Sequence, residues 1–428
     1  LMADQMAAAM TGAYGGPALT QAMDALAATG TRFDTAYTPC PLCTPARAAL
    51  LTGRFPSRTR TYDNAGIVPA DVPTWAHSLR AAGYEVVASG KMHMVGPDQL
   101  HGIERRLTPD IYPTDFSWTP ANECYVAAAT TSSEKAEAAR SAGPCDESWQ
   151  LDYDEDVHHQ ALAFLRERPA GSRPFCLVVS YTHPHPPYWA PRPFWDLYGD
   201  EDLDAARAAD TEAGKNTPMD RWLHGFQGLS DSDRADENFG RRLRRAYLAM
   251  ISYVDSRIGE LLACLKDLAL DDRTVSAAVS LLDLAPTLTD IGGGEALPDA
   301  EGESLLPLLE GDATSMAAPR VLSEYLGEGV PAPCFLVREG PVKVVYAHGE
   351  KEVAFDLSKD PGETTDVADR PEYAAVLERC RAELERRFDV QALAADMIAS
   401  RRDRVAIHAA MQAGQPTCWP VAAAPMTN

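Results

Sequence analysis

Short apolar runs that alternate with helical segments are the feature that most constrains the fold of this chain. The runs at residues 84–89 and 174–181 are long enough for buried strands, and each follows a segment with helical periodicity. Strands that alternate with helices predict an α/β fold with a mostly parallel sheet covered on both faces. Helices are expected at residues 22–30, 74–83, 154–167 and 241–268.

Polar residues that carry chemistry follow three of the expected strands. Asp4 follows Leu1-Met-Ala, which has the character of the end of a buried strand whose start is missing. His93 and His183 come directly after the runs at 84–89 and 174–181. Because ligands collect outside the carboxyl ends of parallel strands, we expect these three side chains to share one site.

The character of the chain changes after about Pro319. Antiparallel strands are expected at 342–346 and 352–357, followed by a charged amphipathic helix at 371–388. We therefore predict a catalytic α/β domain over residues 1–318 and a smaller C-terminal α+β subdomain over residues 319–428. The polar regions 126–143 and 200–236 are expected to be rich in loops.

Composition excludes several classes of function. The net charge of −23 argues against a nucleic-acid partner, because phosphates require a basic face. No run of 18 apolar residues and no signal-peptide pattern is present, which predicts no contact with a membrane. Nine cysteines without framework spacing suit a reducing compartment, so we expect a cytoplasmic protein.

The segment from residue 40 to residue 54 carries the most specific pattern. It reads Cys-Pro-Leu-Cys-Thr-Pro-Ala-Arg-Ala-Ala-Leu-Leu-Thr-Gly-Arg. Cys40 and Cys43 form a C-x-x-C pair, which is compatible with a redox centre or half of a zinc site. No second C-x-x-C follows, and the other cysteines are scattered. A structural cysteine at position 43 and a surface charge at Arg47 are the simpler alternatives.

This segment resembles the C-x-P-x-R signature of formylglycine-dependent sulfatases, extended through Leu51-Thr-Gly-Arg54. The resemblance is to the choline sulfatases in particular at residues 89–102, 110–118, 180–185 and 323–328. It runs from Asp4 to about residue 387. It implies the alkaline phosphatase-like α/β sandwich, with a mostly parallel central sheet.

The resemblance implies how the reaction proceeds. Cys43 would be oxidised to formylglycine after translation, and one hydroxyl of the hydrated aldehyde would attack sulfur and expel the alcohol. Collapse of the second hydroxyl to the aldehyde would then release sulfate. Arg47 would hold the modified residue in place.

Further roles follow from the same resemblance. Lys91 and His93 resemble the pair that contacts the sulfate and the formylglycine, and their spacing on an extended segment points both side chains the same way. His183 resembles the histidine that protonates the leaving alcohol or holds the sulfate. His185 is a weaker candidate for a functional residue.

A divalent cation is expected at the same place. Asp4 resembles the carboxylate that binds Ca²⁺, or alternatively Mg²⁺ or Mn²⁺, since oxygen ligands suit these ions. Gln5 stands where many sulfatases carry a second acid, and the residue derived from Cys43 would complete this set. The alternative for Asp4 is a strand-end cap.

A choline group would need a different kind of pocket, because a quaternary ammonium ion has no N–H group that could donate a hydrogen bond. Quaternary ammonium ions are held by aromatic faces and carboxylates. Trp118 and Glu324 are assigned to this pocket by resemblance, with Tyr125 and Tyr325 as additional aromatic residues. The alternative for Trp118 is core packing.

One departure from the family pattern concerns the metal site. Sulfatases carry a strand that ends in Asp-His or Asp-Asn followed by Gly, and no Asp-His-Gly occurs here. The resemblance jumps by several dozen residues between Val275 and Ser276. Either residues that lie between them in the protein are absent from this sequence, or a deletion has removed a core strand. Loss of a central strand would cost more than a typical domain stability of ~5–15 kcal/mol, which favours the first explanation.

The leading functional hypothesis is a sulfatase that hydrolyses choline sulfate in the cytoplasm. Its partners would be this small sulfate ester and a formylglycine-generating enzyme, and the chain is expected to form a homo-oligomer, a dimer or tetramer. The first alternative is an arylsulfatase or phosphonate monoester hydrolase of the same superfamily. The second is a catalytically dead homologue that binds choline sulfate without hydrolysing it.

Overall fold

The computed structural model describes residues 1–120, 133–169, 171–199, 203, 217–230, 232–233, 236–268, 279–310 and 320–413. Three predictions fall outside these residues. They are the aromatic role of Tyr125, the gap between Val275 and Ser276, and the boundary between domains at 318/319. These three stay predictions.

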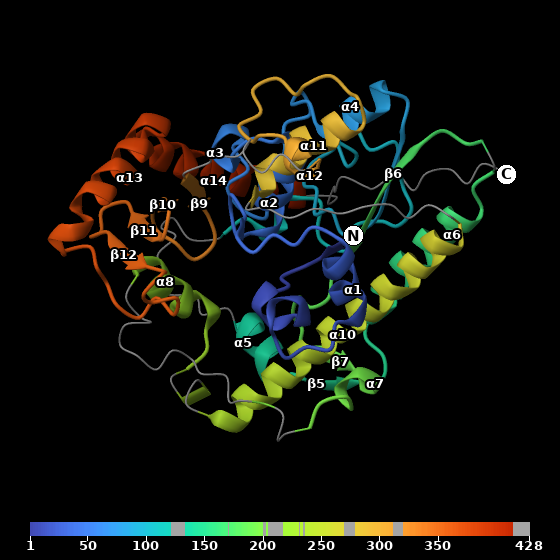
Figure 1. The fold of residues 1–428 in the computed structure, drawn as a ribbon. Coiled ribbons are helices and arrows are strands. Elements are labelled where there is room, and N and C mark those ends of the chain that lie inside the picture. The colour runs from blue at the N-terminus through green and yellow to red at the C-terminus, as the bar shows by residue number, and fades with distance from the viewer. Residues whose placement is uncertain are drawn as a thin grey trace.

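A parallel sheet of four strands lies at the centre of the larger part of the chain (Figure 1). The strands lie in the order β1-β6-β3-β4, and all three pairings are parallel. The predicted strands at 84–89 and 174–181 are confirmed to within one residue at each end. The bounds are Met2–Ala3 (β1), Glu85–Gly90 (β3), Arg105–Arg106 (β4) and Phe175–Tyr181 (β6).

Helices cover both faces of this sheet. On one face, Val87 and Val179 pack against apolar residues of α6 and α10, and α1 packs on α10. On the other face, Val86 and Ala88 pack against α2, α4 and α11, because successive side chains of a strand point to opposite faces. The bounds are Gln21–Thr29 (α1), Cys43–Thr52 (α2), Trp75–Ala81 (α4), Trp149–Arg166 (α6), Glu237–Asp267 (α10) and Leu284–Ile291 (α11).

The remaining elements of this part are short. Two further pairs of strands, β2 with β8 and β5 with β7, are parallel. The strands are Ala36–Tyr37 (β2), Gly143–Cys145 (β5), Trp189–Pro191 (β7) and Val279–Ser280 (β8). The helices are Ala8–Met10 (η1), Gly12–Tyr14 (η2), Pro56–Thr59 (α3), Phe116–Trp118 (η3), Ser133–Arg140 (α5), Arg192–Trp195 (α7), Pro218–Gln227 (α8), Leu281–Asp283 (η6) and Leu306–Leu309 (α12).

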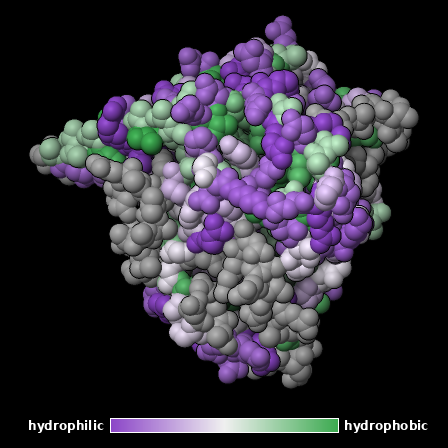
Figure 2. All heavy atoms as spheres, turned by 90° about the vertical axis from the view of Figure 1, so that its left-hand side faces the viewer, coloured by the Kyte–Doolittle hydropathy of each residue, from purple (hydrophilic) through white to green (hydrophobic). Residues whose placement is uncertain are grey.

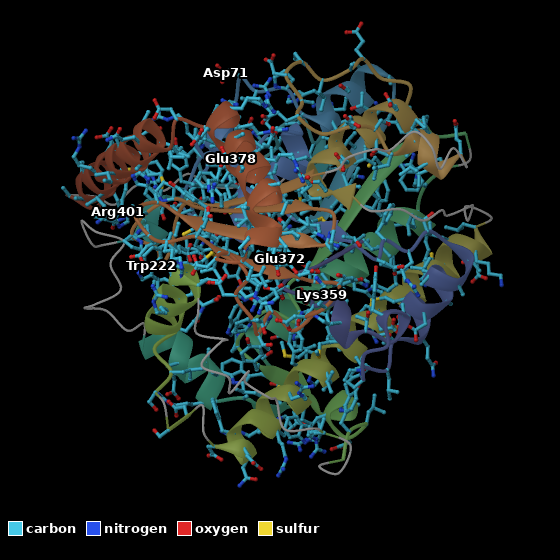
Figure 3. All side chains as sticks on the ribbon, turned by 60° about the vertical axis from the view of Figure 1, so that its left-hand side comes forward. Asp71, Trp222, Lys359, Glu372, Glu378 and Arg401 are labelled. Carbon is cyan, nitrogen blue, oxygen red and sulfur yellow. The ribbon has the colours of Figure 1, made fainter. Side chains whose placement is uncertain are left out.

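Two of these helices correct the prediction of loop-rich regions. α5 lies within 126–143 and α8 lies within 200–236. The reason for α8 is tertiary packing, since Trp222 and Leu223 pack against Tyr325 and Cys334 of the C-terminal sheet. Trp222 is labelled in Figure 3 beside that sheet. A segment that is polar on average thus forms a helix because one of its faces is covered.

The C-terminal subdomain contains an antiparallel sheet in the order β12-β11-β10-β9. Its core includes Phe335, Val344 and Leu377, which join the sheet to α13. The predicted strands at 342–346 and 352–357 and the helix at 371–388 are confirmed with small shifts at their ends. The bounds are Arg320–Tyr325 (β9), Cys334–Glu339 (β10), Val342–Ala347 (β11), Val353–Asp356 (β12), Pro371–Tyr373 (η7), Ala374–Arg387 (α13) and Val390–Gln412 (α14).

Two buried arginines of α14 join this helix to the α/β part of the chain. Arg404 forms a two-pronged ion pair with Asp63, at 2.6 and 2.7 Å. Arg401, labelled in Figure 3, donates to the carbonyl of Pro120 at 2.6 Å. Because Asp63 is fully buried, this pair ties the loop after α3 to α14.

We expect Arg404→Met to destabilise the protein by ~3–5 kcal/mol, because it leaves the Asp63 charge buried without a partner. The free energy of unfolding in urea measures this effect. Arg402→Met is the matched control on the same helix, since Arg402 is exposed and pairs only with its neighbour Asp403 in the described contacts. Equal losses in the two variants would contradict a special role for the buried pair.

Among the described residues, the surface seen from the C-terminal side is mostly hydrophilic, with scattered hydrophobic side chains (Figure 2). In the part of the chain that the structure describes, every helix is too short or too polar to cross a lipid bilayer.

Candidate active site

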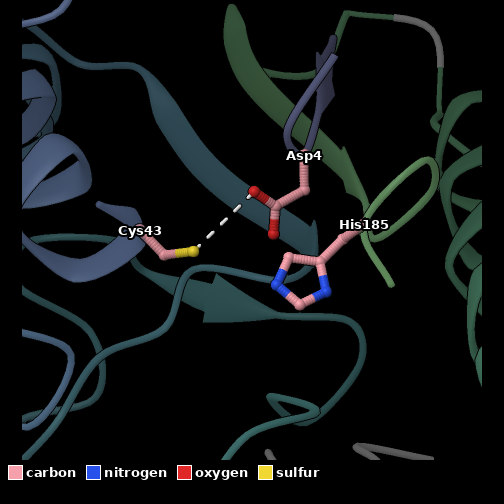
Figure 4. A group of neighbouring side chains, drawn as sticks. All are labelled: Asp4, Cys43 and His185. Carbon is pink, nitrogen blue, oxygen red and sulfur yellow. Dashed lines mark hydrogen bonds between the residues drawn. The ribbon is translucent and has the colours of Figure 1, made fainter. Parts of the chain in front are cut away.

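The site lies where β1, β3 and β6 end and α2 begins. Asp4 follows β1, Cys43 is the first residue of α2, and His185 follows β6. One potential ligand atom from each of these three residues lies within 4.8 Å of those of the other two. Figure 4 shows them side by side, with Cys43 Sγ 3.9 Å from Asp4 Oδ1. Asp4 and Cys43 are 39 positions apart in the sequence, and both lie with His185 at the carboxyl ends of the central strands.

Lys91 supplies the positive charge of the cluster. Its ammonium group is fully buried, donates to Asp4 Oδ2 and lies 3.4 Å from Cys43 Sγ. It also lies 4.1 Å from the centre of the Tyr112 ring. Burial alone would raise the pKa of Asp4, but Lys91 and Arg47 outweigh burial and lower this pKa to about 2. The Asp4 carboxylate is therefore ionised at neutral pH.

Cys43 is held in position but is not activated. Its helix has no side-chain cap from Leu42, and Asn64 Oδ1 accepts from the backbone N–H of Thr44 at 3.0 Å instead. Burial raises the pKa of the Cys43 thiol; Asp4 adds to this effect and Lys91 opposes it. Since only the thiolate is a good nucleophile, the unmodified residue is poorly suited to attack an ester at neutral pH.

Arg47 fastens α2 to the ends of the central strands. It is buried and donates to the carbonyl of Lys91 and, at 3.1 Å, to Ser180 Oγ. Arg47 is therefore not a surface charge, which was the simpler alternative. Arg47 therefore fixes the distance between Cys43 and the residues that follow β3.

The environment of His93 is typical of a ligand-binding residue. It has a φ of 56°, and its backbone N–H donates to Asp110, which is itself paired with Arg106 at 3.1 Å. Both ring nitrogens are buried and have no hydrogen-bond partner in the structure. Burial and the charge of Lys91 lower the pKa of His93 to about 3, so the ring is neutral. Buried polar atoms without partners are rare, and they point here to an anionic or polar ligand.

The two histidines after β6 lie in different environments. His183 is fully buried, with Nδ1 2.7 Å from Asp154 and its ring against Tyr253, in the packing between β6 and α10. His185 instead lies beside Asp4, with Nδ1 2.7 Å from the carbonyl of Pro186. The structure thus brings His185, rather than the predicted His183, to the cluster around Cys43.

An aromatic group borders the cluster on one side. Trp118 lies with its ring centre 5.2 Å from that of His93 and 4.7 Å from that of Tyr112. Trp118 is 39% exposed, so it does not serve as core packing. Tyr112 was not assigned a role from the sequence, although it falls inside the segment 110–118 that resembles the family.

Glu324 and Gln5 lie apart from this arrangement. The Glu324 carboxylate accepts from the backbone N–H of Ser57, and burial raises its pKa to about 8. Glu328, four residues later, accepts from the backbone N–H of Asn64 at 3.4 Å, and its charge acts on Cys43. Gln5 is exposed, and its side chain bonds Tyr188 rather than facing Cys43. Of these two carboxylates, Glu328 is therefore the one whose charge acts on Cys43.

The described residues supply part of a site for a divalent ion. Asp4 offers a carboxylate oxygen, and formylglycine at position 43 would offer an oxygen in place of the thiol; oxygen ligands suit Ca²⁺ and Mg²⁺. The junction of Val275 and Ser276, where the resemblance expects further ligands, lies outside the described residues.

Comparison with known proteins gives consistent results. Residues 1–280 match the Sulfatase family, and residues 260–389 match the C-terminal region of N-sulphoglucosamine sulphohydrolase. The choline-sulfatase of Rhizobium meliloti is 36% identical over 451 aligned positions, covering 93% of this chain and 87% of that protein. An arylsulfatase of Clostridium perfringens is 25% identical, covering 87% of this chain and 90% of that protein.

A solved structure supports the fold. The phosphonate monoester hydrolase of Agrobacterium radiobacter superposes with a TM-score of 0.71 at 23% identity, covering 92% of this chain and 95% of that one. The predicted architecture, an α/β sandwich with a parallel central sheet and a C-terminal subdomain, is confirmed.

Proposed function

The chain belongs to the sulfatase family and hydrolyses sulfate esters, and on this premise we propose that its substrate is choline sulfate. The observation that carries the proposal is the pairing of two unlike half-sites. A buried, cationic half-site around Lys91 suits the sulfate, and the aromatic pair beside it, exposed Trp118 and partly buried Tyr112, suits a quaternary ammonium ion.

The sulfate half-site is built from Lys91, His93 and His185. Lys91 provides a fixed positive charge in a dry environment, where an anion is stabilised more strongly than in water. The two ring nitrogens of His93 have no partner, so an oxygen of the sulfate would satisfy one of them. This half-site is preorganised, because Arg47 and Asp110 hold the backbone of the residues that form it.

The nucleophile in this proposal is formylglycine derived from Cys43. The family generally uses this residue together with a divalent metal. A hydrated aldehyde supplies a hydroxyl that attacks sulfur and a second hydroxyl whose collapse releases sulfate. The raised pKa of the Cys43 thiol supports the need for such a modification, since the thiol itself is mostly protonated.

His185 is the residue placed to give a proton to the departing alcohol. Its Nδ1 lies 2.7 Å from the Pro186 carbonyl oxygen and 3.0 Å from the Tyr112 hydroxyl, and its other ring nitrogen is turned toward Asp4 and Cys43 (Figure 4). An imidazole beside the departing oxygen suits general acid catalysis. This role was predicted for His183, whose contacts with Asp154 and Tyr253 keep it inside the core.

Comparison of kcat/KM on choline sulfate, an aryl sulfate and a phosphonate monoester tests the proposal. We expect the highest value on choline sulfate. A higher value on the aryl sulfate or the phosphonate would favour the alternatives of an arylsulfatase or a phosphonate monoester hydrolase. The phosphonate substrate is included because the fold resembles that of a phosphonate monoester hydrolase, although that hydrolase is more distant from this chain than the choline-sulfatase is.

Mass spectrometry of the peptide that contains Cys43 tests the modification. Formylglycine at position 43 supports a catalytic protein and a formylglycine-generating enzyme as its partner. An unmodified thiol in a protein that binds choline sulfate without turnover would instead support the non-catalytic alternative. The cytoplasmic location and the dimer or tetramer stay predictions.

Trp118→Ala is expected to lower kcat/KM on choline sulfate about tenfold, which corresponds to ~1.4 kcal/mol. Turnover of an aryl sulfate, which carries no cation, should fall less. Trp149→Ala is the matched control, because Trp149 is an exposed tryptophan at the start of α6. Equal losses on both substrates together with a lower melting temperature would remove Trp118 from the cation pocket.

Glu328→Gln and Glu324→Gln separate the two candidate carboxylates. Glu328→Gln is expected to lower kcat/KM on choline sulfate about tenfold, because it removes a negative charge that acts on Cys43 and would attract a cationic substrate. Glu324→Gln should have little effect, since a carboxyl with a pKa of about 8 is mostly protonated at pH 7 and glutamine has its shape. A larger loss of kcat/KM in Glu324→Gln than in Glu328→Gln would instead support Glu324 as the carboxylate of the choline pocket.

A further inference from the structure

The segment between β6 and β7 carries His185 and forms neither helix nor strand. Its position therefore depends on contacts with neighbouring elements. The start of α6 provides such contacts, because α6 packs against β6 and begins at the edge of the sheet at which β6 ends. Two side chains of α6 reach this segment. They are Gln150 and Asp154, which lie about one helical turn apart on the same face of the helix.

Asp154 fixes the first half of the segment. Its carboxylate is fully buried and accepts from the backbone N–H groups of Thr182 and His183, at 2.8 and 3.0 Å. It also accepts from the Thr182 hydroxyl at 3.0 Å and lies 2.7 Å from His183 Nδ1. These contacts end one residue before Pro184, so Asp154 holds the start of the loop and not the histidine beside Cys43.

Gln150 fixes the second half, and its contact is with His185 itself. The Gln150 side chain is only 1% exposed, and its Nε2 lies 2.8 Å from the His185 carbonyl oxygen. A carbonyl oxygen can only accept, so the amide nitrogen donates. Gln150 Oε1 is buried and has no hydrogen-bond partner among the described residues. The N–H group is thus the part of this amide that accounts for a glutamine at this position.

The backbone of His185 is held on both sides of its Cα atom. Its N–H donates to the Thr182 carbonyl at 2.9 Å, and its carbonyl accepts from Gln150. The ring is then placed through Nδ1, which lies 2.7 Å from the Pro186 carbonyl oxygen and 3.0 Å from the Tyr112 hydroxyl. Loss of the Gln150 contact would free the peptide unit that follows the Cα atom, and the ring would shift with it.

We propose that Gln150 is a positioning residue for the reaction, because its amide holds His185 where the ring can give a proton to the departing alcohol. This inference rests on the proposed role of His185. In that step sulfur exchanges its bond to the alcohol oxygen for a bond to the nucleophile, and the alcohol oxygen keeps the electron pair and takes a proton from His185. A general acid must lie within ~2.6–3.2 Å of the atom that it protonates. A misplacement of about 1 Å can therefore cost ~10²-fold in rate.

A series of uncharged aryl sulfates tests this role, because the need for a general acid rises as the departing phenol becomes more basic. The measured quantity is kcat/KM, which includes the departure of the phenol. Gln150→Met keeps the length of the side chain and removes the N–H donor. We expect it to lower kcat/KM about 10–100-fold on the ester of a basic phenol and by less than about threefold on a nitrophenyl sulfate. The logarithm of kcat/KM should therefore fall more steeply with the basicity of the phenol than it does in the parent.

Gln99→Met is the matched control. Gln99 is also a buried glutamine, its Nε2 donates to the carbonyls of Met94 and Gly96, and its Oε1 has no partner in the described part of the chain. This variant should keep the parental dependence on the basicity of the phenol. His185→Ala is the reference variant and should show the steepest dependence. Circular dichroism and urea unfolding check that each variant is assayed in its folded state, and Gln150→Leu takes the place of Gln150→Met if the latter does not fold.

An equal loss on every ester in Gln150→Met, together with a steeper dependence in His185→Ala, would overturn the inference and leave the role of His185 standing. The same steepening in Gln99→Met would also overturn it, because loss of any buried amide would then suffice. An unchanged dependence in His185→Ala would instead overturn the proposed role of His185, and the inference with it. These results do not depend on whether choline sulfate is the substrate, because the aryl sulfates in the series carry no cation.

Discussion

Replacement of Cys43 by alanine is expected to abolish hydrolysis of choline sulfate, with a fall in kcat of roughly 10⁴-fold or more, because it removes the covalent nucleophile. The fold should survive, since Cys43 is only partly buried and its helix is held by Asn64 and Arg47. Steady-state kinetics on choline sulfate measure the loss, and circular dichroism checks that the variant is folded.

Cys145→Ala is the control for this experiment, because Cys145 is another partly buried free cysteine that lies outside the site. It should keep the turnover of the parent. Retention of parental activity in Cys43→Ala would disprove covalent catalysis at this position. Loss of activity in both variants, with altered circular dichroism, would show that cysteine substitution harms the fold and not the chemistry.

The two histidines after β6 should give opposite kinds of loss. His185→Ala is expected to lower kcat by about 10²–10⁴-fold, the range for removal of a general acid, with little change in stability. His183→Ala should instead lower the free energy of unfolding by ~2–5 kcal/mol, because it opens a cavity in the core and removes a partner of the buried Asp154.

Urea unfolding and steady-state kinetics on both variants separate these outcomes. His183→Ala, assayed well below its unfolding transition, should keep most of its turnover. If that variant lost turnover without a loss of stability, the original assignment of His183 as the catalytic histidine would stand. His159→Ala, on the exposed side of α6, should change neither quantity.

The fold could largely be predicted because its signals are local. The apolar runs that form β3 and β6 and the periodic segments that form α1, α4 and α10 each contain their own pattern. The rule for strand ends predicted that Asp4 and His93 lie at one edge of the sheet, whereas Cys43 and Lys91 were assigned to the site by resemblance to the family. The helix α8 was missed because its apolar face becomes visible only with the C-terminal sheet that covers it.

The sequence could not predict which of two like residues in one segment belongs to the site, because this depends on the direction of each side chain. His183 and His185 lie in one short motif, yet one points to Asp154 and the other to Asp4 and Cys43. Glu324 and Glu328 likewise lie on one segment, and only the contacts with Ser57 and Asn64 distinguish them. Such directions are set by tertiary contacts that no local pattern contains.

The ion pair between Asp63 and Arg404 has a consequence for the order of events during synthesis. The two residues are 341 positions apart, and Asp63 precedes Asn64, which holds the first turn of α2 through Thr44. A growing chain therefore exposes the Cys43 segment to solution long before α14 leaves the ribosome and fastens the loop beside it. Under the proposed function, translation provides an interval in which a formylglycine-generating enzyme can reach Cys43 before α14 fastens the neighbouring loop.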